Sequence, residues 1–114
     1  RSLLRQPVFI YGEPGTGKEQ IARYLYLHSS LANRPFIVVN CALLNEKTWD
    51  FLLNHYNSPL SATGNTIYFQ NFESLPPQWS SELLAAIEET GLARRVRLIF
   101  SCSIVEGEPV PGSP

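Results

Sequence analysis

Short apolar runs alternate with longer amphipathic stretches along this chain. Four runs predict strands because each is brief, apolar and bounded by turn-forming residues. They are residues 7–11 (PVFIY), 36–40 (FIVVN), 66–70 (TIYFQ) and 96–102 (VRLIFSC). Three stretches predict helices, at residues 18–30, 46–53 and 77–90. This alternation predicts an α/β fold in which helices cover both faces of a parallel sheet.

Helical spacing predicts which side chains face the core. Asn45 is the expected N-cap of the second helix and Gly91 the residue that ends the third. In the first helix, Arg23 and Tyr26 fall away from the apolar stripe. The predicted inward residues are Ile21, Ala22, Leu25 and His28 in the first helix, Trp49, Leu52 and Leu53 in the second, and Trp79, Leu83, Leu84 and Ile87 in the third.

Composition is typical of one globular domain, with 114 residues and 44% hydrophobic content. Nine basic and ten acidic residues give a net charge of −1 without a run of either sign, which argues against a nucleic-acid or polybasic membrane surface. The apolar runs are far shorter than the roughly 20 residues of a membrane span, so no membrane partner is expected. Cys41 and Cys102 are interpreted as buried reduced thiols, which favours the cytoplasm. We expect a domain at residues 1–107 and a linker or tail at 108–114, within a larger protein.

The segment from Gly12 to Lys18 (GEPGTGK) matches the phosphate-binding pattern G-x-x-x-x-G-K. Glycines let the backbone curl so that amide groups point at phosphate oxygens, and Lys18 adds a positive charge. The predicted helix starting at Lys18 directs its positive dipole end to the same anion. Glu19 follows, where Ser or Thr usually offers a hydroxyl to Mg²⁺. The nucleotide-binding candidates are Gly12, Glu13, Pro14, Gly15, Thr16, Gly17, Lys18 and Glu19.

The loop with Glu19, GEPGTGKE, resembles the GESGTGKE of sigma-54-dependent transcriptional activators, the bacterial enhancer-binding proteins of the AAA+ class. Further similar segments, within residues 7–103, are IAR (21–23), HS (28–29), NRPF (33–36), VNCA (39–42), GNTIYF (64–69) and VRLI (96–99). The resemblance implies a P-loop NTPase three-layer sandwich with a parallel sheet of four to five strands, in the order 5-1-4-3-2. No fifth strand is evident, so the strand at residues 7–11 is expected at an exposed edge, where another chain can pair with it.

The chain departs from this family at the residues that drive hydrolysis. The family's third strand ends in Asp-Glu, which holds Mg²⁺ and activates water, whereas this chain has Gln70-Asn71. A neutral amide neither balances Mg²⁺ nor accepts a proton at neutral pH. Glu73 is the nearest alternative acid, beyond the strand end. Asn40 matches the family asparagine that pairs with the catalytic glutamate; a strand-end hydrogen-bonding role is the alternative.

The motif GAFTGA, through which the family contacts the sigma factor, does not occur between residues 40 and 66. The connection at residues 92–95 is also short, so remodelling of sigma-54 is not expected. Ser103 lies near the family's first sensor position, or is simply a strand-end serine. The remaining polar candidates are given solvent or structural roles, namely Arg94, Arg95, Arg97, His28 and His55.

The resulting prediction is a nucleotide-binding regulatory domain of a transcriptional regulator, such as a two-component response regulator. It would hold ATP or ADP with little hydrolysis, have no catalytic residue and no metal site, and depend little on Mg²⁺. Partners would be like domains and the transcription machinery, with DNA contacted only by a domain outside this chain. Two alternatives stay open: an active ATPase with acids from elsewhere, and an interaction scaffold whose pocket is kept empty by Glu13 and Glu19.

Overall fold

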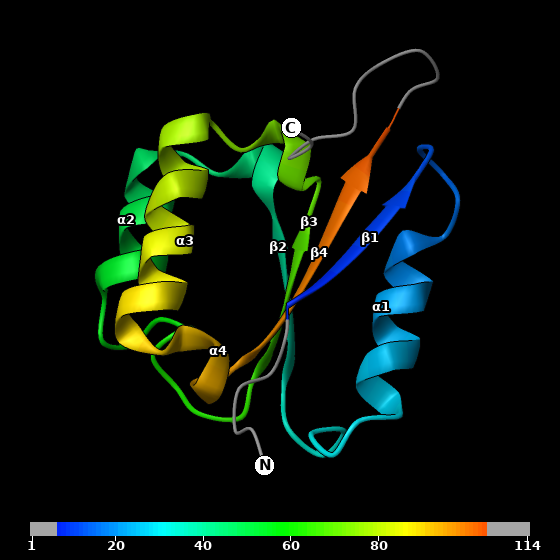
Figure 1. The fold of residues 1–114 in the computed structure, drawn as a ribbon, viewed down its shortest axis with the longest axis horizontal. Coiled ribbons are helices and arrows are strands. Elements are labelled where there is room, and N and C mark those ends of the chain that lie inside the picture. Colours follow the sequence, from blue (N-terminus) through cyan, green and yellow to red (C-terminus); the bar gives the residue numbers. More distant parts are fainter. Residues whose placement is uncertain (1–6, 105–114) are drawn as a thin grey trace.

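The computed structural model describes residues 7–104 and shows a four-stranded parallel sheet between two layers of helices (Figure 1). The strands are β1 (Val8–Gly12), β2 (Phe36–Asn40), β3 (Thr66–Gln70) and β4 (Arg97–Ser103). Their order is β1-β4-β3-β2, and every neighbouring pair is parallel. The predicted α/β sandwich and the order of its strands are confirmed. The tail expected at residues 108–114 lies outside the described residues.

One helix covers one face of the sheet and two cover the other (Figure 1). Helix α1 (Lys18–Leu27) lies alone, opposite α2 (Glu46–Asn54) and α3 (Pro77–Thr90). Three short elements were not predicted: the 3-10 helices η1 (Cys41–Leu43) and η2 (Phe72–Ser74), and α4 (Leu92–Arg95). Helix α1 also ends three residues earlier than expected, because the chain turns at His28 and Ser29.

Two predicted helix boundaries are confirmed by their capping geometry. Asn45 accepts a hydrogen bond from the backbone of Thr48, whose hydroxyl accepts one from the backbone of Asn45, so the two form a capping box. Gly91 follows α3 at φ 69°, a left-handed conformation that glycine adopts without steric cost. No helix within residues 7–104 is both long enough and apolar enough to cross a membrane.

The sheet has a core on each face. The side facing α2 and α3 buries Phe69, Leu98 and Phe100 against Trp49, Leu52 and Leu83. The side facing α1 buries Ile10, Tyr68 and Ile99 against Ala22.

Three side chains that were predicted to face the core are exposed: Ile21 and His28 of the first predicted helix and Leu84 of the third. The prediction is wrong at these positions. In their place Tyr26 turns inward. Its ring packs on Phe36 at a tilt of 43° with ring centroids 4.9 Å apart, and its hydroxyl is hydrogen-bonded to the carbonyls of Ala32 and Arg34.

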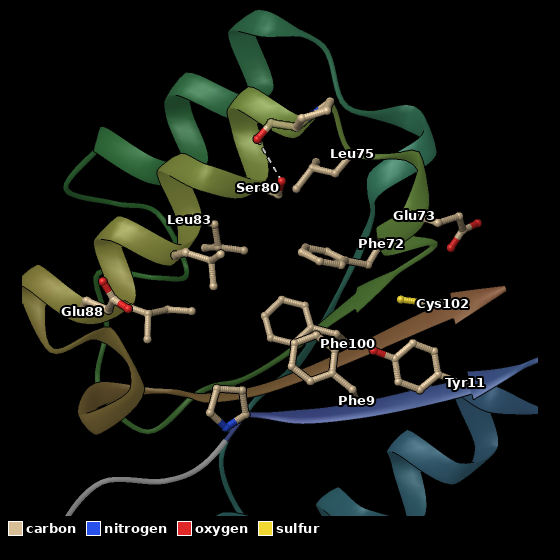
Figure 2. A pocket seen from close by; sticks show the side chains of 14 residues that line it. Phe9, Tyr11, Phe72, Glu73, Leu75, Ser80, Leu83, Glu88, Phe100 and Cys102 are labelled. Carbon is tan, nitrogen blue, oxygen red and sulfur yellow. Dashed lines mark hydrogen bonds between the residues drawn. The ribbon is translucent and has the colours of Figure 1, made fainter. Parts of the chain in front are cut away.

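Strand β1 lies at the edge of the sheet, as predicted, and pairs only with β4 among the described residues. Phe9 is 45% exposed and Tyr11 44%, so helices do not fully cover this strand. A groove of about 630 Å³ runs between β1, β4 and α3, with Phe9, Phe100 and Leu83 in its wall (Figure 2). The helices therefore cover β3 and β4 on both faces, as expected. They leave the face of β1 that carries Phe9 and Tyr11 partly exposed.

Candidate functional site

The phosphate loop connects β1 to α1 and is held by its own side chains. Gly15 and Gly17 have φ values of 81° and 79°, which favour glycine at both positions. The Lys18 Nζ donates to the carbonyl oxygens of Gly12 at 3.2 Å and Glu13 at 2.9 Å. The Thr16 hydroxyl also donates to the Glu13 carbonyl, at 2.7 Å. The side chain of Lys18, the first residue of α1, is thus folded back over the phosphate loop.

A cavity of about 270 Å³ opens beside this loop, at the carboxyl ends of β3 and β4. It brings five of the eight predicted loop residues together with Gln70 and Asn71 from the end of β3. Gly12, Glu13, Thr16 and Asn40 are not among its lining residues. The lining consists of Pro14, Gly15, Gly17, Lys18, Glu19, Tyr68, Gln70, Asn71, Ser101 and Ser103.

Tyr68 and Ser101 also belong to this site, although the sequence did not predict them there. The Tyr68 hydroxyl donates to the Ser101 Oγ at 2.8 Å, and both residues are buried. Burial raises the pKa of Tyr68 above its usual value, so its hydroxyl stays protonated as a donor. Strand alternation was the available signal, since residues 68 and 70, like 101 and 103, point to one face.

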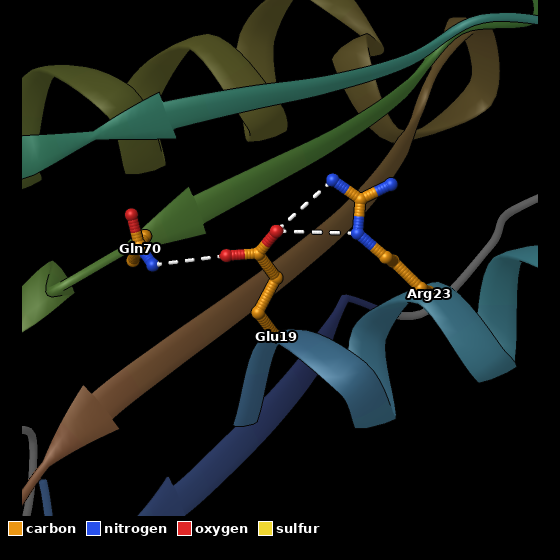
Figure 3. A network of polar contacts seen from close by, with 3 residues as sticks. All are labelled: Glu19, Arg23 and Gln70. Atoms are coloured by element: carbon orange, nitrogen blue, oxygen red, sulfur yellow. Dashed lines mark hydrogen bonds and ion pairs between the residues drawn. The ribbon is translucent and has the colours of Figure 1, made fainter. Parts of the chain in front are cut away.

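Among the residues that the structure describes, Glu19 is the only carboxylate that lines the cavity. Its Oε1 accepts a hydrogen bond from the Gln70 Nε2 at 3.4 Å, and its Oε2 accepts from the Arg23 Nε and Nη2 at 3.2 and 3.0 Å (Figure 3). Arg23 is one turn further along α1, and the ion pair is about half exposed. Such a pair adds little stability, so its main effect is on the charge near the cavity.

Asn40 and Asn71 pair at the ends of β2 and β3. The Asn71 Nδ2 donates to the Asn40 Oδ1 at 2.9 Å, and the same oxygen accepts from the backbone of Ala42 at 3.0 Å. Asn71 has a φ of 58°, a conformation that asparagine tolerates better than most residues. Both contacts are strand-end hydrogen bonds, which fits the alternative interpretation of Asn40, and the glutamate that the family asparagine pairs with is absent at position 71.

Glu73 does not reach the cavity. Its Oε1 accepts a hydrogen bond from the backbone of Ser103 at 2.9 Å, and its side chain lines the groove on the opposite face of the sheet. The negative charge of Glu73 acts on two buried thiols, Cys41 and Cys102. Burial, with a smaller contribution from Glu73, raises the pKa of Cys41 to about 12 and that of Cys102 to about 11.

The other polar candidates lie away from the cavity lining. The His28 ring packs against Tyr24 at a tilt of 33°, with ring centroids 4.1 Å apart, and His55 stacks between Phe51 and Tyr56. Arg94 is exposed as predicted.

Arg95 and Arg97 are less exposed than the solvated charges expected beside a strand, because both are half-buried. Arg95 donates to the Thr90 carbonyl at 2.6 Å, next to the end of α3.

The donor set fits a phosphate and does not fit Mg²⁺. Backbone amides, Lys18 and the start of a ten-residue helix suit an anion. Magnesium prefers carboxylate oxygens, and here the carboxylate of Glu19 is engaged by Gln70 and Arg23. Within residues 7–104 no group of three or more His, Cys, Asp or Glu could hold a metal ion.

Comparisons with known proteins agree with this geometry. The family model of the sigma-54 interaction domain matches residues 2–108. Over 100 residues the chain is 33% identical to the transcriptional regulatory protein ZraR of Klebsiella oxytoca, covering 76% of this chain and 23% of ZraR. It is 36% identical over 104 residues to the Psp operon transcriptional activator of Escherichia coli, covering 80% of this chain and 32% of that protein.

Among solved structures, NtrX from Brucella abortus in complex with ATP has a similar fold, with a TM-score of 0.70 and 26% identity. That match covers 91% of this chain and 26% of NtrX. The chain thus spans less than a third of the length of each of these relatives.

Proposed function

We propose, given that this chain belongs to the family of sigma-54 interaction domains, that it is a nucleotide-binding regulatory domain with little or no hydrolysis. The observation that carries the proposal is the cavity beside the phosphate loop. Lys18 and the glycines of the loop line one side, and the amides of Gln70 and Asn71 line the other. The site keeps the groups that bind phosphate. It has neutral amides at the two positions where the acids that drive hydrolysis are expected.

Binding of ATP or ADP is supported by the chemistry of the loop. Its amides need no side-chain charge to bind phosphate oxygens, and Lys18 can leave its two carbonyl partners for a phosphate. NtrX, which has a similar fold, was crystallised with ATP and also with ADP. We therefore assign the cavity to the phosphates of an adenine nucleotide.

Slow turnover follows from the residues at the end of β3. An amide at position 71 cannot take a proton from water, and loss of a general base costs about 10²–10⁴ in rate. The Asn71 amide is also committed as a donor to Asn40. We expect the bound nucleotide to act as a structural or signalling ligand.

The two alternative functions have less support. An active ATPase needs an acid from elsewhere, and Glu73 is hydrogen-bonded to the Ser103 backbone on the far side of the sheet. A scaffold with an empty pocket needs uncompensated negative charge, yet Glu19 is paired with Arg23 and Glu13 does not line the cavity. We accordingly favour nucleotide binding over both.

The proposed context is a bacterial transcriptional regulator acting in the cytoplasm, for instance as a response regulator. The chain would contact the transcription machinery or like domains, and another domain would contact DNA. Because the sequence between β2 and β3 carries no GAFTGA motif, we propose regulatory contacts in place of sigma-54 remodelling.

Calorimetric titration with ATP and ADP tests binding, and phosphate release tests turnover. We expect saturable binding by the wild type, loss of binding in Lys18→Ala, and no effect of Lys47→Ala on the exposed surface of α2. Phosphate release should stay near background and rise about 100-fold in the double variant Gln70→Asp, Asn71→Glu. Fast turnover by the wild type, or an unchanged titration in Lys18→Ala, contradicts the proposal.

A further inference from the structure

We propose that this cavity takes its nucleotide free of divalent metal, so that Mg²⁺ does not strengthen binding. The inference rests on the proposed nucleotide site and adds a property to it. It comes from the contacts that join Glu19 to Gln70 and Arg23 (Figure 3).

The local charge at the cavity disfavours a metal cation. Lys18 and Glu19 are the charged side chains that line the cavity, and Arg23 pairs with Glu19. Two positive charges against one negative charge leave this set at a net +1. A metal cation is repelled by such a set, whereas a phosphate is attracted directly. Acids at positions 70 and 71 would reverse the sign to −1 and create the demand for a cation.

The side-chain amide at the end of β3 points its nitrogen at Glu19. Gln70 is oriented with its nitrogen 3.4 Å from the Glu19 Oε1. A carboxylate accepts hydrogen bonds only, so the amide nitrogen, not its oxygen, must face it. The Gln70 amide therefore places a hydrogen-bond donor against the Glu19 Oε1, an oxygen that a metal ion would need as a ligand.

The remaining polar groups suit a bare phosphate. The hydroxyls of Ser101 and Ser103 line the cavity and can donate to phosphate oxygens. Lys18 is the one cation in the lining, so a ligand with less negative charge is easier to neutralise without metal. We therefore expect ADP to bind at least as tightly as ATP.

The test is a fluorescence titration with ADP carrying a methylanthraniloyl group, in excess MgCl₂ and, separately, in excess EDTA. For the wild type we expect dissociation constants that agree within about twofold, because the carboxylate in the lining, Glu19, is already engaged by Gln70 and Arg23. In Gln70→Asp a second carboxylate joins Glu19, so binding in MgCl₂ should become about tenfold tighter than in EDTA. Gln78→Asp makes the same change on the exposed first turn of α3 and should behave like the wild type.

Wild-type binding that is several-fold tighter in MgCl₂ overturns the metal-free site and leaves the proposed function intact. No wild-type binding in either buffer overturns both. Equal binding in the two buffers by a folded Gln70→Asp, checked by circular dichroism, also overturns the role given to Gln70. If that variant does not fold, the wild-type comparison decides alone.

Discussion

The Asn71 side-chain amide donates to the Asn40 Oδ1 across 2.9 Å and ties the end of β3 to the end of β2. The pair consists of two neutral amides, so neither partner titrates and the contact does not depend on pH. Asn71 holds it from a backbone at φ 58°, and it is the only residue other than glycine with positive φ within residues 7–104. The site thus keeps a fixed contact between two strand ends without a carboxylate.

The first prediction concerns this backbone. Asn71→Ala removes the hydrogen bond and leaves a Cβ in left-handed conformation, whereas Asn71→Gly removes the bond but relaxes the backbone. We expect the alanine variant to be less stable than the glycine variant by about 1 kcal/mol. Urea unfolding at neutral pH measures the difference. Equal stability of the two variants would show that the conformation at position 71 carries no strain.

The second prediction concerns the start of the phosphate loop. A Cβ at Gly12 would lie 2.7 Å from the Thr16 Oγ1, closer than real contacts allow. Gly12→Ala should therefore cost about 1 kcal/mol of stability and weaken nucleotide binding, because the Thr16 side chain must rotate away and give up its hydrogen bond to the Glu13 carbonyl. In a Thr16→Ala background the colliding hydroxyl is gone, so the same change should cost measurably less. A double-mutant cycle read by urea unfolding tests this, and additive effects would refute the contact.

The third prediction concerns pH and the buried thiols. The pKa values of Cys41 and Cys102 are raised from 9.0 to about 12 and about 11. Above pH 9 the unfolded chain releases these protons and the folded chain retains them, so stability is complete below pH 9 and falls as pH rises toward 11. Each thiol contributes a slope of at most about 1.4 kcal/mol per pH unit.

Urea unfolding between pH 8 and pH 10, in the presence of a reductant, measures that slope. The double variant Cys41→Ala, Cys102→Ala is the control, since it lacks both groups and should flatten the curve. An identical slope in the variant would assign the alkaline loss to other groups, such as Tyr68, whose pKa is also raised.

Much of this fold could be predicted because local chemistry determines it. Asn45 and Gly91 act through contacts with their own neighbours, and the loop before Lys18 requires its glycines, so the sequence alone located all three. The inward stripe of α1 was harder, because a helix that covers a sheet alone buries a narrow face. Only Ala22 is fully buried there, and Ile21 stays exposed.

Parts of the site lay beyond sequence analysis because they join distant segments. The contact between Glu19 and Gln70 spans 51 positions, and that between Tyr68 and Ser101 spans 33. Motif comparison located Gln70 as a departure from the family but could not show that its amide would bind Glu19. Side-chain direction and partner choice emerge only once the strands are assembled.

The last prediction concerns the contact between α2 and α3. The Trp49 indole nitrogen donates to the Glu82 Oε1 at 2.9 Å, and the Trp49 ring stacks on Trp79 at 5.2 Å with planes 6° apart. Glu82→Ala leaves the indole donor without this acceptor and should cost about 1 kcal/mol, whereas Glu82→Gln keeps an acceptor and should cost less. Glu89→Ala, at an exposed position on the same helix, is the matched control and should be near neutral.

Repeating Glu82→Ala in a Trp49→Phe background removes the donor, so the cost should largely vanish when measured by thermal and urea unfolding. A cost that persists in that background would mean that Glu82 stabilises α3 by another route.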